Sequence, residues 1–137
     1  MWWIYALLSA FFAALTAIFA KVGIKGVDTD LATAIRTVVI LIIAWAIAFA
    51  RGGVSMIPTL SKQNVLFLCL SGIATGLSWI FYFKALQLGK VSQVAPVDKL
   101  SVALAIILSI LFLGEALTWK TGIGALLIIS GTIVLIL

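Results

Sequence analysis

Long apolar stretches alternate with short polar connections along the whole chain. Trp2 to Ala20 is 19 residues without a charged side chain, and Gln63 to Phe83 is 21 such residues. Leu31 to Ala50 holds one charge, Arg36, in 20 residues, and 17 uncharged residues run from Thr121 to the C-terminus. A helix needs about 20 mostly apolar residues to cross a bilayer. Each of these stretches therefore predicts a membrane-spanning helix.

A further stretch, Val91 to Gly114, is 24 residues long and is interrupted by Pro96, Asp98 and Lys99. With it, the sequence predicts an all-α membrane protein with five transmembrane helices in a single domain over residues 1–137. The expected spans are residues 2–21, 30–51, 63–86, 92–113 and 119–137. The first span lacks a basic n-region and is longer than a signal-peptide core, so we expect it to be retained.

Composition agrees with a membrane location and excludes several chemistries. Hydrophobic residues make up 65% of the chain and charged residues 9%, against roughly 25% charged in soluble domains. Without histidine, a His-based catalytic triad and the common zinc sites are absent, and we expect no metal and no cofactor. The net charge of +5 is scattered between apolar runs, which argues against a nucleic-acid partner. The single cysteine, Cys69, is expected to be a buried structural thiol.

Five spans place the two termini on opposite sides of the membrane. The connections on the N-terminal side hold three basic residues and those on the other side hold four, or six with the embedded Arg36 and Lys99. The positive-inside rule then weakly favours a cytoplasmic C-terminus. A bias this small also permits insertion in both orientations.

Small and polar residues recur at helical spacing in the first four predicted spans. In lipid such residues mark the faces where helices pack or where a polar cavity opens. Packing is the simpler interpretation for any single hydroxyl, whereas the coincidence on four helices suggests a shared cavity. The candidate pathway residues of this kind are Ser9, Thr16, Thr75, Ser78, Trp79, Tyr82 and Ser101.

The embedded charges are the strongest candidates for function. A charge at the bilayer centre costs about 2.5–3.5 kcal/mol even on insertion scales, so it tends to be functional. Arg36 and Asp98 are expected about 8–10 Å inside their helices, at the same side, where an ion pair is possible. Arg36 and Lys99 have snorkelling to the interface as an alternative. Lys99 projects about 100° away from Asp98 on a regular helix, and Asp98 is too short to snorkel, so we expect a paired or cavity-facing carboxylate.

Pro96 has two interpretations. In the first turn it is only a helix start, since its missing N–H is unpaired there anyway. Otherwise it breaks the helix just before Asp98, as in the interrupted helices where transporters bind substrates.

In the last span, Gly124 and Gly131 share one face. This spacing predicts close approach of another helix, and we expect it to be the same helix of a second copy.

Four segments of the second half form a recognisable set: Tyr82-Phe83-Lys84-Ala85-Leu86, Val94-Ala95-Pro96-Val97, Leu113-Gly114-Glu115 and the run from Gly122 to Gly131. Together they resemble the EamA domain, the five-helix unit of the drug/metabolite transporter superfamily. Longer members carry two such units in inverted orientation, and this chain resembles the bacterial and archaeal members with one unit.

The resemblance implies a five-helix half-transporter that works as an antiparallel dimer, with helices 1 to 4 lining the pathway. Small multidrug exporters, which are similar, carry protons on a glutamate in helix 1. That place falls near Ala13 here, so proton coupling would pass to Asp98.

We therefore expect a secondary active transporter of small metabolites in the inner membrane, with lipid, substrate and a second copy or a homologous half-unit as partners. The alternatives are a subunit of a lipid-linked metabolite flippase, with a groove open to lipid between helices 3 and 4, and a structural subunit without transport. A membrane enzyme is disfavoured because the usual acid and base partners are missing.

Overall fold

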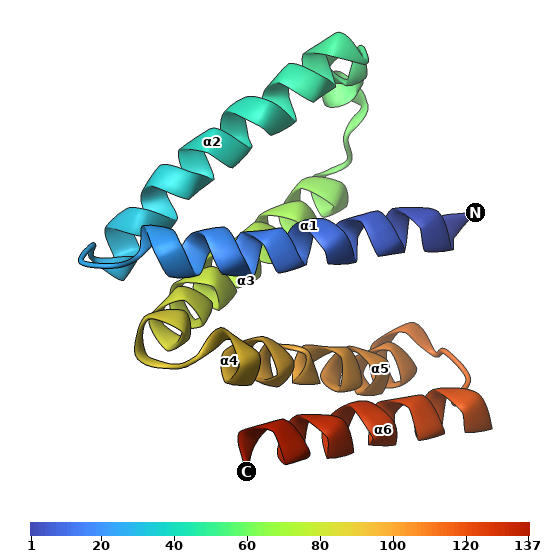
Figure 1. Cartoon of the computed structure of the whole chain (residues 1–137). Helices are drawn as coiled ribbons and strands as arrows, with labels where there is room; N and C mark the ends of the chain where they lie inside the picture. The colour runs from blue at the N-terminus through green and yellow to red at the C-terminus, as the bar shows by residue number, and fades with distance from the viewer. The chain divides into compact units, whose positions relative to one another are not determined.

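The computed structural model describes all residues 1–137 as helices and connecting loops. Five helical segments are long and apolar enough to cross a membrane, which confirms the predicted all-α class and the five spans. Four of them are continuous helices: α1 (Trp2–Gly23), α2 (Thr29–Ala50), α3 (Lys62–Leu88) and α6 (Trp119–Ile136) (Figure 1).

The fourth span, Val91–Leu113, consists of two helices, α4 (Val91–Asp98) and α5 (Leu100–Leu113). Pro96 lies inside α4, and the interruption falls at Lys99, just after Asp98 rather than just before it. Pro96 has no N–H for the Ser92 carbonyl, and its ring crowds that group. Three residues later the helical turn becomes narrower, because the Lys99 N–H donates to the carbonyl of Pro96, three residues back (3.0 Å), as well as to that of Ala95, four residues back (3.3 Å).

Local residues determine where α2 and α6 begin and where α5 ends. The Asp28 carboxylate accepts hydrogen bonds of 3.0 Å from the N–H groups of Asp30 and Leu31, which caps the start of α2. The Thr118 hydroxyl does the same for α6, accepting from the Thr121 N–H at 3.2 Å. Gly114 ends α5 with a φ of 68°, a left-handed conformation that favours glycine.

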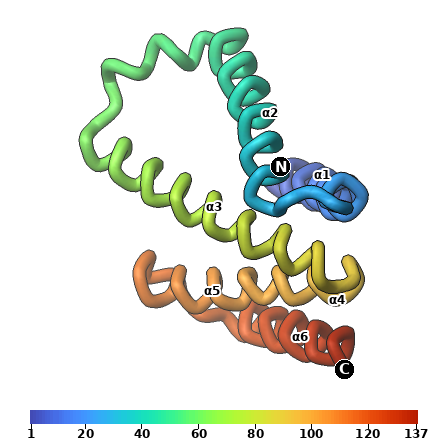
Figure 2. Tube along the Cα trace, turned by 90° about the vertical axis from the view of Figure 1, so that its left-hand side faces the viewer, coloured from blue at the N-terminus to red at the C-terminus, as the bar shows by residue number.

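A short 3₁₀ helix, η1 (Gly53–Thr59), stands in the connection between α2 and α3, where the sequence predicted only a loop. Figure 2 shows it in the extended connection between the two long helices. Gly52 allows the turn after α2 because its φ is 71°.

The chain forms two compact units, residues 19–87 and residues 1–18 together with 88–137, and α1 contributes to both. In the second unit, α5 and α6 lie side by side in both views, and α4 also contacts α6 (Figures 1 and 2). Thr132 is the buried residue of α6, and its hydroxyl bonds the carbonyls of Ile128 (2.8 Å) and Pro96 (3.2 Å). The second bond ties α6 to α4.

The unit of residues 19–87 has its core where the end of α1, the start of α2 and the end of α3 meet. The Lys21 ammonium donates a hydrogen bond to the Leu86 carbonyl, and the Gln87 amide donates to the Val27 carbonyl at 3.0 Å. The buried residues here are Ala20, Ile24, Thr29, Thr33, Phe83 and Leu86. We call this place the α1–α2–α3 junction.

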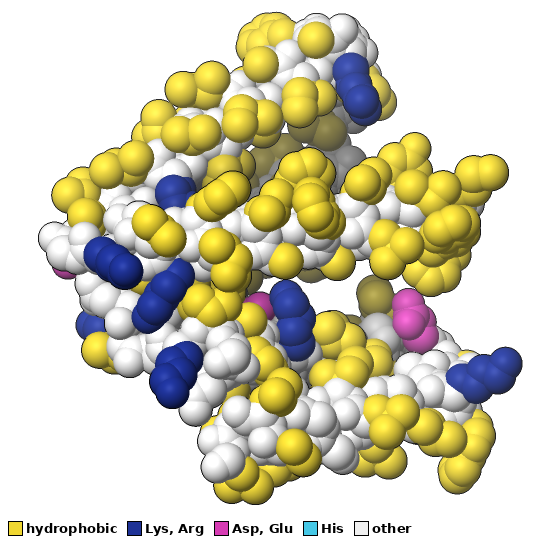
Figure 3. Space-filling view, viewed as in Figure 1, with side chains coloured by type: hydrophobic (Ala, Val, Ile, Leu, Met, Phe, Trp, Pro, Cys, Tyr) yellow, Lys and Arg dark blue, Asp and Glu magenta, His cyan; other side chains and the backbone are white.

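Away from these contacts the spans present apolar side chains outward. Hydrophobic side chains cover most of the face seen in Figure 3. Only 0–11% of the residues in the apolar window of each span are buried within the chain. Cys69 is exposed on α3, so the prediction of a buried thiol was wrong: an apolar run in a membrane span faces lipid as readily as protein.

Replacing Thr132 with valine should lower the free energy of unfolding by about 1 kcal/mol, since a hydrogen bond between membrane helices is lost at unchanged side-chain volume. The measurement is unfolding of the purified protein by SDS in dodecylmaltoside micelles. Thr132→Ser, which keeps the hydroxyl, is the control and should retain most of the stability. Equal stability of the valine variant and the wild type would show that the bond to Pro96 does not hold α6 on α4.

Candidate functional site

Arg36 is the charged group at the α1–α2–α3 junction. It lies seven residues after the first residue of α2, which places its Cα about 10 Å inside the helix. Its guanidinium carbon is 4.0 Å from the centroid of the Phe83 ring and 5.6 Å from the Trp79 ring. Both distances are within the range of cation–π attraction. Two rings of α3 therefore hold the guanidinium against the bundle.

The guanidinium has a donor without an acceptor. The Nη1 atom of Arg36 is buried and has no hydrogen-bond partner. The nearby hydroxyls of Thr33 and Thr37 donate to the carbonyls of Thr29 and Thr33, both at 2.8 Å, as is common for threonine in membrane helices. Aromatic rings attract the positive charge but offer no lone pair for its N–H groups.

Phe83 completes this site and was absent from the predicted pathway residues. Its side chain is 1% exposed, and its ring lies 5.6 Å from that of Tyr82. Its position four residues after Trp79, on the same helix face, is the signal that identifies it. Lys21 was also missed: it binds a backbone carbonyl across the junction, and nothing in the sequence marks that role.

The predicted hydroxyl stripe of α3 lies beside the aromatic face. Tyr82 is half-buried and interacts electrostatically with Arg36, and its part in a pathway stays a prediction. Thr75 is exposed and donates to the Ser71 carbonyl of its own helix at 2.9 Å, and Ser78 is exposed. The bond of Thr75 fits the simpler packing interpretation.

In the unit that contains α4, Asp98 and Lys99 form an ion pair with 3.2 Å between Nζ and Oδ2. Their side chains are 34% and 58% exposed, respectively. A regular helix would have separated them, and they meet because helical geometry is interrupted at Lys99. Asp98 is thus paired with Lys99, which was expected from the sequence to point elsewhere, and its role in a pathway stays a prediction. The ion pair between Arg36 and Asp98 stays a prediction.

The remaining predicted pathway residues lie on α1 and α5. Ser9 and Ser101 are exposed, and Thr16 is half-buried. Their part in a pathway stays a prediction.

The two glycines of α6 leave room beside their backbone. Gly131 is exposed and Gly124 is half-buried. A Cβ atom added at either position would meet nothing within 4 Å. Their predicted contact with the same helix of a second copy stays a prediction.

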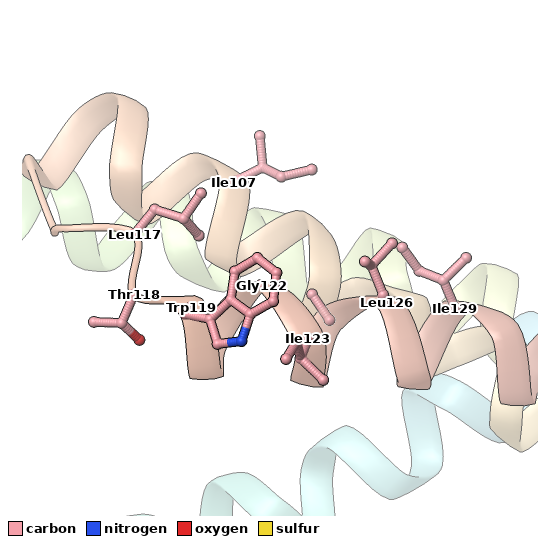
Figure 4. A pocket seen from close by; sticks show the side chains of 9 residues that line it. Ile107, Leu117, Thr118, Trp119, Gly122, Ile123, Leu126 and Ile129 are labelled. Atoms are coloured by element: carbon pink, nitrogen blue, oxygen red, sulfur yellow. The ribbon is translucent and has the colours of Figure 1, made fainter.

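An apolar groove of about 510 Å³ runs between α5 and the first half of α6 (Figure 4). Leu117 and Trp119 stand at its loop end, and Leu126 and Ile129 lie further along α6. Its lining residues are Ile107, Leu117, Thr118, Trp119, Gly122, Ile123, Ala125, Leu126 and Ile129. It contains no ionisable side chain, so it offers an apolar surface and no acid–base chemistry.

Comparison with known proteins gives a consistent result. The family model described as "EamA-like transporter family" matches residues 1–137. The chain is 49% identical over 134 residues to a Sinorhizobium protein named "Uncharacterized transporter in cobO 3'region", covering 98% of this chain and 95% of that protein. It is 36% identical over 77 residues to an uncharacterized protein of Methanocaldococcus jannaschii, covering 56% of each. No solved structure matches the chain significantly.

Truncation of Phe83 should weaken the junction more than truncation of its neighbour Phe81. Phe83→Ala leaves a cavity beside Arg36 and should lower the free energy of unfolding by roughly 1–3 kcal/mol, less than in a soluble core because lipid tails also solvate apolar groups. Phe81, which is 69% exposed, is the matched control, and Phe81→Ala should change stability little. SDS titration in micelles measures both variants. Equal losses would refute the anchoring role of Phe83.

Proposed function

Since the chain belongs to the EamA-like transporter family and is a multi-pass membrane protein, we propose that it is a secondary active transporter that moves a small metabolite across the inner membrane by alternating access. The name of its Sinorhizobium relative, a transporter, supports a transport role over an enzymatic one. We propose that the whole chain acts as one five-helix half-unit.

The observation that carries this proposal is the state of Arg36. A full positive charge sits within a membrane-spanning helix, one of its nitrogens is buried, and that nitrogen has no acceptor. Ionisable groups inside membrane spans face cavities or substrate pathways because lipid does not solvate them. A purely structural arginine would have its donors bonded to carbonyls or a carboxylate.

Two features support a dimer. The spans bury at most 11% of their apolar windows within the chain, and the glycine edge of α6 at Gly124 and Gly131 is uncovered. Small residues at such an edge let two helix backbones approach closely. The weak asymmetry of basic residues between the two sides supports antiparallel pairing.

Asp98 is the proposed coupling group, because it is the carboxylate embedded in a span. Lys99, with its Nζ 3.2 Å from Oδ2, is the charged partner that this carboxylate would exchange for a proton or a substrate charge.

Asp98→Asn should abolish coupled flux while leaving the protein folded. Proteoliposomes loaded with a pH-sensitive dye are challenged with a panel of amino acids, organic acids and quaternary amines, and the proton movement that each compound drives is recorded. The expected loss is tenfold or more for Asp98→Asn and little for Asp30→Asn, whose carboxylate lies in the exposed first turn of α2. Full coupled flux in the Asp98 variant would remove Asp98 as the coupling group. Absence of flux in the wild type for the whole panel would favour the structural-subunit alternative.

A tag on either terminus should be detected on both sides of the membrane. Because the basic residues are almost evenly divided between the two sides, the chain should insert in both orientations. Each tag should then be accessible to an impermeant reagent in about half of the molecules. The measurement uses a single cysteine at each terminus in intact cells, in the Cys69→Ser background, since Cys69 is exposed. A single fixed location for each terminus would contradict the antiparallel homodimer.

A further inference from the structure

Arg36 has a buried N–H donor at Nη1 without an acceptor, which is a feature of a ligand site rather than of a structural contact. Arginine carries five N–H donors and no acceptor. The ring of Phe83 covers the guanidinium at 4.0 Å and that of Trp79 lies at 5.6 Å, so the charge is held in place by groups that cannot receive its hydrogen bonds. A buried donor left unpaired is destabilising by about 1–3 kcal/mol, more when it is charged. A bound acceptor would recover that free energy.

No acidic side chain of the same unit is placed to neutralise Arg36. Residues 19–87 contain two acidic residues, Asp28 and Asp30. Asp28 is engaged by two backbone N–H groups at the start of α2. Asp30 lies six residues before Arg36, which turns it to a different face of the helix, and it is exposed. Within residues 19–87, no carboxylate is therefore placed to neutralise the charge of Arg36.

The geometry fits a planar oxyanion of one negative charge. A guanidinium binds a carboxylate through two parallel N–H···O bonds, and contact with the two rings holds that fork in place. One arginine balances one negative charge. A phosphate dianion would bring a second, unbalanced charge into the span, which is costly in a low-dielectric environment.

We propose that Arg36 binds the carboxylate of the transported solute, that Phe83 and Trp79 are the wall which holds the guanidinium in place, and that the substrate is a small monocarboxylate. This assignment rests on the proposed transport function and goes beyond it by naming the charge and binding group of the substrate. Phe83 is a positioning residue, since it acts through Arg36.

The test uses phenylglyoxal, which modifies arginine side chains, on the purified full-length protein in lipid nanodiscs. The chain has two arginines, Arg36 and Arg51, so Arg51 serves as the control within the same molecule. The probes are the sodium salts of pyruvate, lactate, benzoate and acetate, compared with sodium phosphate and sodium chloride at equal ionic strength. Peptide mass spectrometry follows the rate of modification at each arginine.

We expect at least one monocarboxylate to slow modification of Arg36 by about tenfold at ten times its dissociation constant, following simple site occupancy. Modification of Arg51 should not change. Protection of Arg36 by chloride to the same extent, or stronger protection by phosphate than by every carboxylate, would overturn the assignment, and so would absence of protection by the whole panel.

Variants separate binding from folding. The protecting carboxylate should raise the melting temperature of the wild type and of Phe81→Ala. It should not raise that of Arg36→Gln or Arg36→Lys, since lysine keeps the charge but lacks the planar fork. Phe83→Leu should bind several-fold more weakly with Arg36 intact. Wild-type binding by Arg36→Gln would refute the site.

Failure of the assignment and failure of the transport function have different signatures. If the proteoliposomes transport a member of the panel that has no carboxylate, and no carboxylate protects Arg36, the transport proposal stands and the substrate class is wrong. If a carboxylate protects Arg36 and no compound is transported, the site stands and the chain binds its ligand without moving it.

Discussion

The exclusion of water from the bilayer is the constraint on which this structure depends. Every backbone N–H and C=O group must be paired within its own segment there, so the chain is almost entirely helical wherever it crosses the membrane. The same constraint removes the usual advantage of burying apolar side chains, because lipid tails accept leucine and isoleucine as well as a protein core does. Polar contacts then decide which helices meet, as between Lys21 and the Leu86 carbonyl and between Thr132 and the Pro96 carbonyl.

This constraint explains why the spans were readable from the sequence. Length and the absence of charge are sufficient to mark a membrane helix, and the observed ends lie within about two residues of the expected ones. Asp28 and Thr118 set the starts of α2 and α6, because their side chains accept hydrogen bonds from N–H groups that are free in the first turn of a helix. Pro96 indicated a break in the fourth span, but the position of that break at Lys99 and the 3₁₀ helix before α3 depend on local backbone geometry, which apolar periodicity does not encode.

The candidate site was predictable only in part, and the reason is again physical. Arg36 was evident because a charge in a span is costly to leave unsolvated. Its ring partners were harder to identify, since the rotation of α3 against α2 is set by interlocking side chains and not by either helix alone. Periodicity placed Phe83 and Trp79 on one face but did not show that this face, rather than the adjacent hydroxyl stripe, meets the guanidinium. For Cys69 the error came from equating an apolar environment with burial inside the protein.

In the proposed transporter, the charge of Arg36 would make only one state of the cycle sensitive to membrane voltage. A charge that crosses the full field gains or loses about 2.3 kcal/mol for each 100 mV. With an anion bound, the charge of the Arg36 guanidinium would be balanced and the field would exert little net force on that pair. Without the anion, the guanidinium would be drawn toward the negative compartment, so in this proposal the membrane potential sets the resting orientation of the empty protein and, through it, the side on which the next solute binds.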